Sequence, residues 1–299
     1  MNNIKTEFSI KDLENLSGIK AHTIRIWEKR YNLLKPNRTD TNIRYYSLES
    51  LQKLLNVSFL NNNGYKISKI ANLDDKEVPT IAREIASRTA LKSHAINSLK
   101  MAMMNFDQNL LYTTYNNLLQ EKTFKEIFYE VFIPFLSELG ILWQTDTITP
   151  AHEHFVSTFI KQKILVNTEK IQNIEPLDSP KTFVLFLPDN EIHDIGLLFI
   201  NYELTSRGHK TIFLGQSVPV NSLKDLQKFY KEIIFVSYFT IKPEPEQISN
   251  YLNEFQKNII NGHKAKLYIL GRALHGTEKT AVPSDITMYD SIESLVKDL

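Results

Sequence analysis

The stretch TFVLFLPDNEIHDIGLLFINYELTSRG, residues 182–208, joins an apolar strand to a helix through a polar turn. Its first part is typical of a strand covered on both faces, and its last part has helical periodicity. The runs KTIFLG, EIIFVSY, AKLYILG and DITMYD follow, separated by helical segments that include VNSLKDLQKFY. This alternation predicts a parallel sheet with helices on both faces, an α/β Rossmann-like domain of the flavodoxin type over residues 178–299.

The turn of this stretch places His193 between two carboxylates, Glu191 and Asp194. In parallel α/β sheets, ligands bind outside the carboxyl ends of the strands, where this turn is expected. A neutral imidazole is a good transition-metal ligand, and its second nitrogen needs an acceptor, which either carboxylate can supply. Gly196 lets a planar ligand or a backbone approach closely. Because the chain has no cysteine, a single histidine suggests a metal whose cofactor brings its own macrocycle. The plainer alternative is a loop histidine that titrates near neutrality.

The composition is that of a globular protein with a basic N-terminal part. Residues 1–75 contain 12 Lys and Arg against 8 Asp and Glu, a local charge of +4, and the remainder holds 23 against 26, or −3. This asymmetry is compatible with a nucleic-acid-binding head. The lack of cysteine excludes disulfides, thiolate metal sites and thiol catalysis. We find neither a signal-peptide core nor a run of roughly 18 apolar residues, and expect a cytoplasmic protein without a membrane partner.

Three domains are expected from these patterns. Residues 1–75 hold short helices with turn signals between them, and residues 76–177 have the periodicity of long amphipathic helices, typical of a four-helix-bundle-like cap. The segment NIEPLDSP, residues 173–180, contains two prolines and is interpreted as a linker to the domain of residues 178–299.

The head carries the signals of a helix-turn-helix. Ser9 can cap a first helix, Gly18 makes a turn, and a second, basic helix extends from about Lys20 to Tyr31. The basic, aromatic segment NRTDTNIRYYS follows, and a helix for the major groove with such a loop is a sensible DNA clamp. The alternative is a small helical domain with a solvated basic face.

The segment HTIRIWEKRYNLLKPNRTDTNIRYYS, residues 22–47, resembles the winged-helix head of MerR-type transcriptional regulators. Those heads contain T-x-R-x-x-E, P-x-R and R-x-Y, which this chain supplies as Thr23, Arg25, Glu28, Pro36, Arg38, Arg44 and Tyr46. The resemblance implies that the protein binds near-palindromic double-stranded operator DNA as a dimer. The expected DNA contacts are His22, Arg25, Trp27, Lys29, Arg38, Arg44 and Tyr46.

The pattern Glu191-x-His193-x-x-Gly196 resembles the D/E-x-H-x-x-G signature of cobalamin-binding domains. The resemblance implies that His193 is the lower axial ligand of cobalt. It also marks further cofactor-binding positions, which are Leu214, Gly215, Pro219, Ser237, Thr240, Gly271 and Arg272. Arg272 departs from the family, which has a second glycine there. Its side chain would crowd the cofactor tail or, if it points outward, grip the tail phosphate, and this puts cofactor affinity in question.

The segment WQTDTITPAHEH, residues 143–154, places Trp143 before the pair Glu153 and His154. A packing tryptophan and a solvated polar pair would explain it without any ligand. In its position before a cobalamin-like domain, however, the segment resembles the cap of CarH/LitR-type photoreceptor repressors. The resemblance implies that Trp143 packs on the adenosyl group of adenosylcobalamin and that Glu153 and His154 bracket it. His154, or His152, is then the candidate upper cobalt ligand after photolysis.

Together these resemblances imply a cobalamin-dependent, light-responsive transcriptional repressor and not an enzyme. Adenosylcobalamin would control self-association between dimer and tetramer, and thereby operator binding. One alternative is a repressor of the same architecture that has lost cobalamin and answers to another ligand or to a protein partner. A second alternative is a cobalamin-dependent methyl-transfer protein.

Overall fold

The computed structural model describes residues 7–299 apart from 63, 75–76, 87–90, 146, 176, 276 and 278–281. The chain divides into two compact units, Met1–Phe159 and Ile160–Leu299. The long helix α10 (Pro150–Lys170) begins in the first unit and ends in the second.

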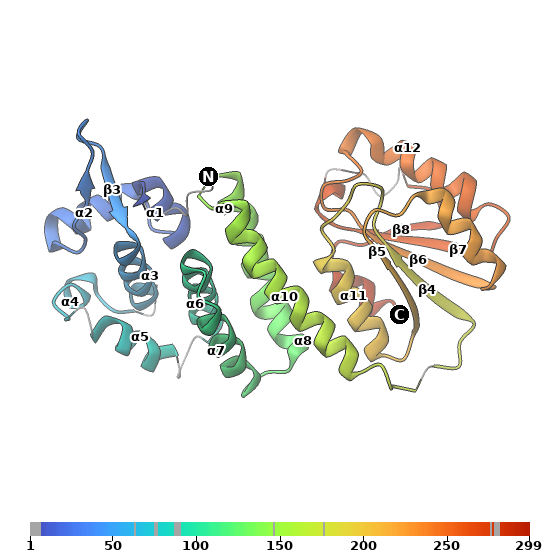
Figure 1. The fold of residues 1–299 in the computed structure, drawn as a ribbon, viewed down its shortest axis with the longest axis horizontal. Coiled ribbons are helices and arrows are strands. Elements are labelled where there is room, and N and C mark those ends of the chain that lie inside the picture. The colour runs from blue at the N-terminus through green and yellow to red at the C-terminus, as the bar shows by residue number, and fades with distance from the viewer. Residues whose placement is uncertain are drawn as a thin grey trace. The chain divides into compact units, whose positions relative to one another are not determined.

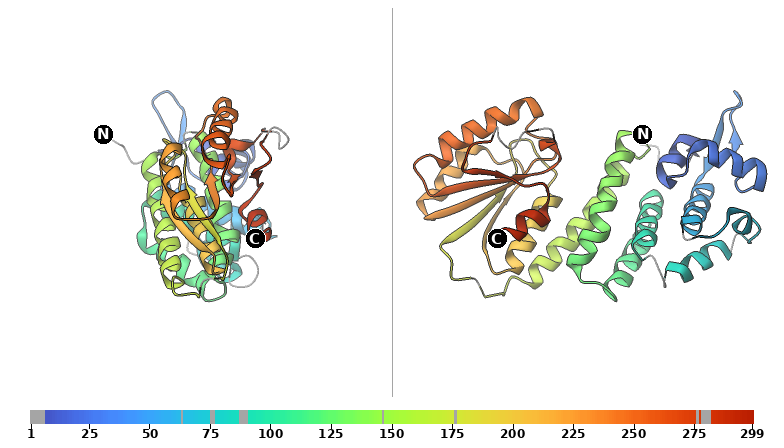
Figure 2. Two further views of the ribbon diagram at one scale, coloured as in Figure 1. Left: turned by 90° about the vertical axis from the view of Figure 1, so that its right-hand side faces the viewer. Right: turned by 180° about the vertical axis from the view of Figure 1, so that it is seen from behind.

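The first unit starts with a winged helix-turn-helix, as expected from the sequence. Its elements are β1 (Glu7–Phe8), α1 (Ile10–Ser17), α2 (Ala21–Tyr31), β2 (Asn37–Arg38), β3 (Arg44–Ser47), α3 (Leu48–Asn62) and α4 (Ile67–Ile70). Ser9 caps α1 in a capping box with Asp12, and Gly18 ends it with φ 74°. Strand β3 pairs antiparallel with β1 and β2, and the β2–β3 hairpin projects from the unit (Figure 2).

A run of helices completes the first unit. They are α5 (Glu77–Ala86), α6 (Leu91–Asn105), α7 (Gln108–Leu119), α8 (Phe124–Ile127), the π-helix η1 (Phe128–Phe132), α9 (Ile133–Gln144) and the start of α10. Their core contains stacked and edge-on rings such as those of Tyr115, Phe132 and Phe159. Within the described residues, no helix is both long and apolar enough to cross a membrane.

The second unit is the predicted α/β domain (Figure 1). Its strands are β4 (Lys181–Phe186), β5 (Lys210–Gly215), β6 (Glu232–Tyr238), β7 (Ala265–Leu270) and β8 (Ile286–Met288), all parallel and in the order β5-β4-β6-β7-β8. The connecting helices are α11 (Ile195–Ser206), η2 (Val220–Lys228), α12 (Pro245–Phe255), η3 (Gln256–Ile260), η4 (Arg272–Leu274) and α13 (Ile292–Lys297). The segment VNSLKDLQKFY, expected to be helical, forms the 3₁₀ helix η2 over Val220–Lys228, a type of helix that is common in connectors.

The strand order determines where a ligand binds in this unit. From β4 the chain first adds β5 on one side and then β6, β7 and β8 on the other. The carboxyl ends of β4 and β6 therefore lie at the point where the order reverses, which is the usual ligand crevice of such sheets. Helices α11 and α13 cover one face of the sheet, and α12 covers the other (Figure 1).

Candidate cofactor site and candidate DNA interface

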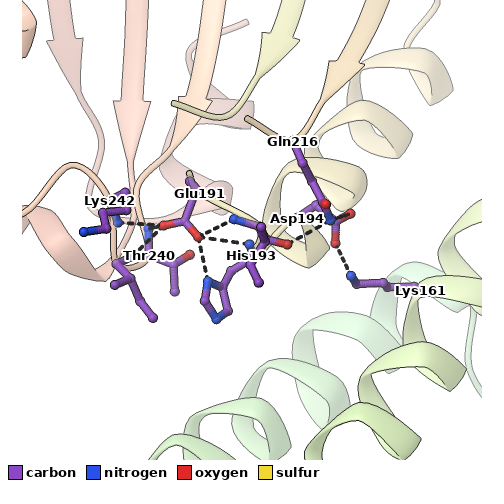
Figure 3. Close-up of polar contacts among 9 residues, drawn as sticks. Lys161, Glu191, His193, Asp194, Gln216, Thr240 and Lys242 are labelled. Carbon is purple, nitrogen blue, oxygen red and sulfur yellow. Dashed lines mark hydrogen bonds and ion pairs between the residues drawn. The ribbon is translucent and has the colours of Figure 1, made fainter. Parts of the chain in front are cut away.

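Glu191 is the structural centre of the loop between β4 and α11. Its side chain is 1% exposed. Oε1 accepts hydrogen bonds from the backbone N–H groups of the next two residues at 2.9 and 3.0 Å. Oε2 accepts hydrogen bonds from the backbone N–H groups of Thr240, Ile241 and Lys242 at 3.2, 2.6 and 2.8 Å. One carboxylate thus ties the loop after β4 to the loop after β6 (Figure 3).

The same carboxylate orients His193. Burial raises the pKa of Glu191, but hydrogen bonds from His193 and from the backbone of Lys242 and Ile241 outweigh burial and lower the pKa to about 2. An ionised carboxylate only accepts hydrogen bonds, so the 2.6 Å contact between its Oε1 and His193 Nδ1 places a proton on Nδ1. The lone pair is then on Nε2, which lies at the far edge of the ring from Glu191 in Figure 3. The His193 side chain is 44% exposed, and this nitrogen suits a metal.

Asp194 has partners other than His193. Its Oδ2 accepts a hydrogen bond from Gln216 Nε2 at 2.6 Å, and its Oδ1 forms an ion pair with Lys161 Nζ at 2.6 Å. Gln216 also donates to the carbonyl oxygen of Ile192 at 2.9 Å. Of the two acceptors that the sequence left open for His193, the structure therefore selects Glu191. No local pattern points to Lys161 or Gln216, because the fold brings both from distant segments.

Gly196 and Ser237 differ from their expected surroundings. A Cβ atom on Gly196, in the first turn of α11, would lie 2.6 Å from the Tyr238 ring, so this glycine accommodates a side chain of its own unit. Ser237 was expected to be a cofactor-binding residue. It is fully buried, and its hydroxyl donates to the carbonyl of Phe186 at 2.9 Å. Its role here is to join β6 to β4. Thr240 donates its backbone N–H to Glu191 Oε2.

The remaining predicted positions lie around the same sheet edge. Leu214 is 39% exposed near the end of β5, Gly215 has φ 82°, and Pro219 precedes η2. Gly271 has φ 124°, and a Cβ there would collide with the backbone of Phe239. A residue other than glycine would be strained at that position. Arg272 follows as an exposed residue at the start of η4.

The cap residues belong to the first unit, whereas Glu191 and His193 belong to the second. Trp143 lies in α9 and is 47% exposed, which is unusual for so large an apolar ring. Glu153 and His154 lie in the first turn of α10, with Oε2 and Nε2 3.3 Å apart and the His154 side chain 74% exposed. His152 is instead fully buried and stacks on Phe106 at 4.7 Å, which makes it a packing residue here.

The head presents a basic surface from two elements. His22, Arg25 and Lys29 are exposed on α2. Arg38 and Arg44 are direct cross-strand partners in the β2–β3 hairpin. A basic helix beside a basic wing is a suitable arrangement for groove and phosphate contacts.

Two residues expected to touch DNA lie inside the head. Trp27 is 8% exposed and Tyr46 is fully buried. The Tyr46 hydroxyl donates to Glu28 Oε1 at 2.5 Å, and Glu28 Oε2 lies 3.8 Å from Arg44 Nε. The expectation for Trp27 and Tyr46 is therefore corrected. Their rings pack in the core of the head, and Tyr46 holds the wing against α2 through Glu28.

Comparison with family models finds two matches along the chain. Residues 8–77 match the MerR HTH family regulatory protein model, and residues 95–166 match a B12 binding domain model. The second match covers the helical region from α6 into α10.

Two curated proteins match over most of the chain. The HTH-type transcriptional repressor CarH of Myxococcus xanthus is 29% identical over 222 residues, which are 72% of this chain and 73% of CarH. The HTH-type transcriptional repressor CarA of the same organism is 22% identical over 247 residues, which are 82% of this chain and 81% of CarA.

A solved structure shares the fold. The monomethylamine corrinoid protein of Methanosarcina barkeri superposes with a TM-score of 0.57 at 13% identity, covering 69% of this chain and 97% of that protein. This likeness shows a shared fold only, and the chemistry of the site depends on the residues described above.

Proposed function

We propose that this chain, which matches the MerR HTH and B12 binding domain models and resembles CarH, is a cobalamin-dependent, light-responsive transcriptional repressor. It would bind double-stranded operator DNA in the cytoplasm through the basic surface of α2 and the wing. The observation that carries the cofactor part of the proposal is the Glu191–His193 contact. It prepares one imidazole nitrogen, Nε2, as a ligand at the carboxyl edge of the sheet.

The donor set fits a corrinoid. His193 offers a single ligand atom, so the other ligands of the metal must come from a macrocycle and from an upper group. Glu191 fixes the tautomer of that imidazole, as acceptors behind metal-bound histidines generally do. The backbone of residues 240–242 in turn fixes Glu191. Arg272 is exposed at η4, which favours the outward orientation in which its guanidinium reaches a phosphate of the cofactor tail.

We assign the adenosyl form of the cofactor because the cap segment resembles that of CarH/LitR-type photoreceptor repressors. When bound, adenosylcobalamin supplies a cobalt–carbon bond that light cleaves. The exposed indole of Trp143 offers an aromatic plane for the adenosyl group, and the Glu153 carboxylate can accept hydrogen bonds from ribose hydroxyls. His154, exposed beside Glu153, would be available as a further nitrogen ligand for the cobalt.

In this proposal the cofactor controls self-association between dimer and tetramer. A dark oligomer holds several DNA heads on one operator, and multivalency raises its affinity without new base contacts. Light shifts the equilibrium between two assembly states, and repression ends.

The test is an absorption spectrum of the purified full chain mixed with adenosylcobalamin in the dark, desalted and then illuminated. We expect a retained corrinoid spectrum that changes irreversibly in light, with a lower oligomeric mass by light scattering and weaker operator binding. His193→Ala should lose the cofactor or hold it with a base-off spectrum. A wild-type protein that retains cofactor but keeps its mass and operator affinity after illumination would refute the light-responsive switch.

A repressor of the same architecture that does not bind cobalamin is the second candidate. It is favoured by the Tyr238 ring against Gly196 and by the burial of Ser237. Failure of the wild type to retain any cobalamin in the same experiment, with operator binding intact, would select this candidate. The methyl-transfer alternative has less support, because the curated relatives with long matches are transcriptional repressors.

A further inference from the structure

A cavity of about 360 Å³ opens at the carboxyl ends of β4 and β6, beside the His193 loop. Its walls are residues 188–190 after β4, Lys242 and Pro243 after β6, and Gln247 and Tyr251 of α12. Residues 188–190 lead directly into Glu191, and the Lys242 N–H donates to Glu191 Oε2 at 2.8 Å. The two loops that hold Glu191 and His193 therefore also form this cavity.

Tyr251 contributes an unsatisfied polar group to the wall. Its hydroxyl is buried and has no hydrogen-bond partner among the described residues. Its ring is fixed edge-on against Phe239, with centroids 5.6 Å apart and planes at 86°. Burial raises the pKa of this phenol, and the charge of Asp189 raises it further, so the hydroxyl keeps its proton and can donate. A buried donor without an acceptor is costly, which points to a ligand that supplies one.

The charges at the cavity favour a neutral ligand group over an anion. Among the described residues, Asp189 accepts one long hydrogen bond, 3.4 Å, from the Ser217 hydroxyl and keeps most of its acceptor capacity. The Lys242 ammonium is paired with Glu244 at 2.6 Å. Because Glu244 neutralises the Lys242 ammonium, Asp189 remains as the uncompensated charge of the cavity wall, and an incoming carboxylate or phosphate is repelled. A primary carboxamide accepts from the phenol through its oxygen and donates to Asp189 through its nitrogen, and the Gln247 amide can both donate and accept.

We propose that this cavity binds a primary carboxamide. The source of the carboxamide follows from the proposed function, on which this inference rests. A corrin ring carries several amide side arms, and the two loops that form the cavity also hold the ligand His193. A free small amide has the same chemistry, and the experiment separates the two sources.

The first arm titrates the full chain with hydroxocobalamin and follows the absorbance. Tyr251→Phe should raise the Kd about 3- to 10-fold, the effect of one lost hydrogen bond. The melting temperature of the ligand-free variant should equal or exceed that of wild type, because the removed hydroxyl had no partner. The control is Tyr230→Phe, a tyrosine outside the cavity with its ring under Lys210 at 4.7 Å, which should change neither quantity.

The second arm uses cobalamin monocarboxylates, in which one side-arm amide is hydrolysed to a carboxylate. Wild type should bind one isomer about 10-fold more weakly than the others, because that isomer brings a negative charge to Asp189. Asp189→Asn should reduce this discrimination. The third arm adds propionamide or propionate to ligand-free protein and measures the melting temperature.

The outcomes distinguish the sources from each other and from failure. Selectivity among the monocarboxylates supports a side-chain amide of the corrin ring as the ligand of the cavity. Stabilisation by propionamide but not propionate, lost in Tyr251→Phe and without that selectivity, supports a free amide. If wild type binds no cobalamin, the proposed function fails, and the propionamide arm alone decides the cavity. A Tyr251→Phe protein that binds cobalamin as wild type does, with no response to propionamide, overturns the proposal.

Discussion

At the scale of single residues, Glu191 makes the most hydrogen bonds in the candidate cofactor site. It is almost fully buried, it accepts hydrogen bonds from five backbone N–H groups, and it is the acceptor for His193 Nδ1. A buried carboxylate is stable only when its oxygens are satisfied in this way. Its position therefore determines both the course of two loops and the tautomer of the imidazole.

Replacing Glu191 by glutamine tests this role. Glu191→Gln keeps the size of the side chain, but its amide nitrogen cannot accept a hydrogen bond, so some of the hydrogen bonds to this side chain are lost. We expect cobalamin affinity to fall by about 10- to 100-fold, as when other partners of metal-bound histidines are removed. Absorbance titration measures the affinity, and Glu246→Gln in the first turn of α12 is the exposed control. Equal affinities of both variants would contradict the assignment.

His209 predicts a dependence of stability on pH. Burial lowers the pKa of His209 below 6.5, and the charges of Arg207 and Lys181 lower it further. As the pH falls, the unfolded chain takes up this proton before the folded chain does. The stability contributed by neutral His209 is therefore complete above pH 6.5 and is lost as the pH falls through the folded-state pKa.

Urea unfolding at pH 7.5 and pH 5.5 measures this effect. The loss of stability between the two values should be smaller in His209→Gln than in wild type. His263→Gln, at an exposed position between η3 and β7, is the control and should behave as wild type. The same loss in His209→Gln as in wild type would exclude His209 as the cause.

At the scale of elements, α10 and the wing each connect separate features. Helix α10 carries Glu153 and His154 in its first turn, and further along it carries Lys161, which forms the ion pair with Asp194 next to His193. In the head, the wing strand β3 is joined to α2 through Tyr46 and Glu28. Both connections are made by polar side chains that the surrounding packing partly shields from water.

The Lys161–Asp194 pair should stabilise the His193 loop. The Asp194 side chain is 14% exposed, and Lys161→Met would leave this carboxylate without its cation while keeping an apolar stem. We expect faster amide hydrogen exchange in residues 189–194 and a free energy of unfolding lower by about 1 kcal/mol. Lys170→Met, in the last turn of α10, is the control. Unchanged exchange in Lys161→Met would show that the loop does not depend on this pair.

Stability and DNA binding should separate within the head. Tyr46→Phe removes the hydroxyl bonded to the largely shielded Glu28 carboxylate and should lower the free energy of unfolding by about 1–2 kcal/mol. Exposed Lys29→Ala should leave stability unchanged and reduce the slope of log K against log salt by about one. Urea unfolding and operator titrations at several salt concentrations measure both. If Tyr46→Phe instead weakened operator binding without lowering stability, Tyr46 would belong to the DNA interface.

At the scale of the whole molecule, the chain has two compact units with separate tasks. The first contains the basic surface of the head and the proposed cap residues, and the second contains the loop of Glu191 and His193. In the proposed function, DNA binding and cofactor binding are therefore assigned to different units. This organisation is the reason for proposing a switch in self-association.

Operators with one and two half-sites test that switch. In the dark with adenosylcobalamin, a second half-site should raise affinity by at least 100-fold, because its binding becomes intramolecular. After illumination the gain should fall sharply, while affinity for one half-site stays the same. Mobility-shift titrations on both operators measure the two affinities. An equal gain in affinity from the second half-site in dark and light would show that the cofactor does not control DNA binding.

The sequence alone determined what depends on near neighbours along the chain. The alternation of apolar and helical runs predicts the parallel sheet, the Ser9 cap and Gly18 predict the limits of α1, and the spacing of Glu191 and His193 predicts an imidazole with an acceptor. Periodicity, capping and a two-residue spacing are local properties. They act before the chain is packed and can be recognised from the order of residues.

Only the tertiary structure decided which groups meet across the fold and which are buried. It brings the N–H groups of residues 240–242 to Glu191 and Lys161 to Asp194. It also buries Trp27, Tyr46 and Ser237, which were expected at binding surfaces. The physical reason is that burial and long-range hydrogen bonds depend on how all elements pack together. A residue that resembles a ligand contact in the sequence can therefore be part of the core that holds the true contact in place.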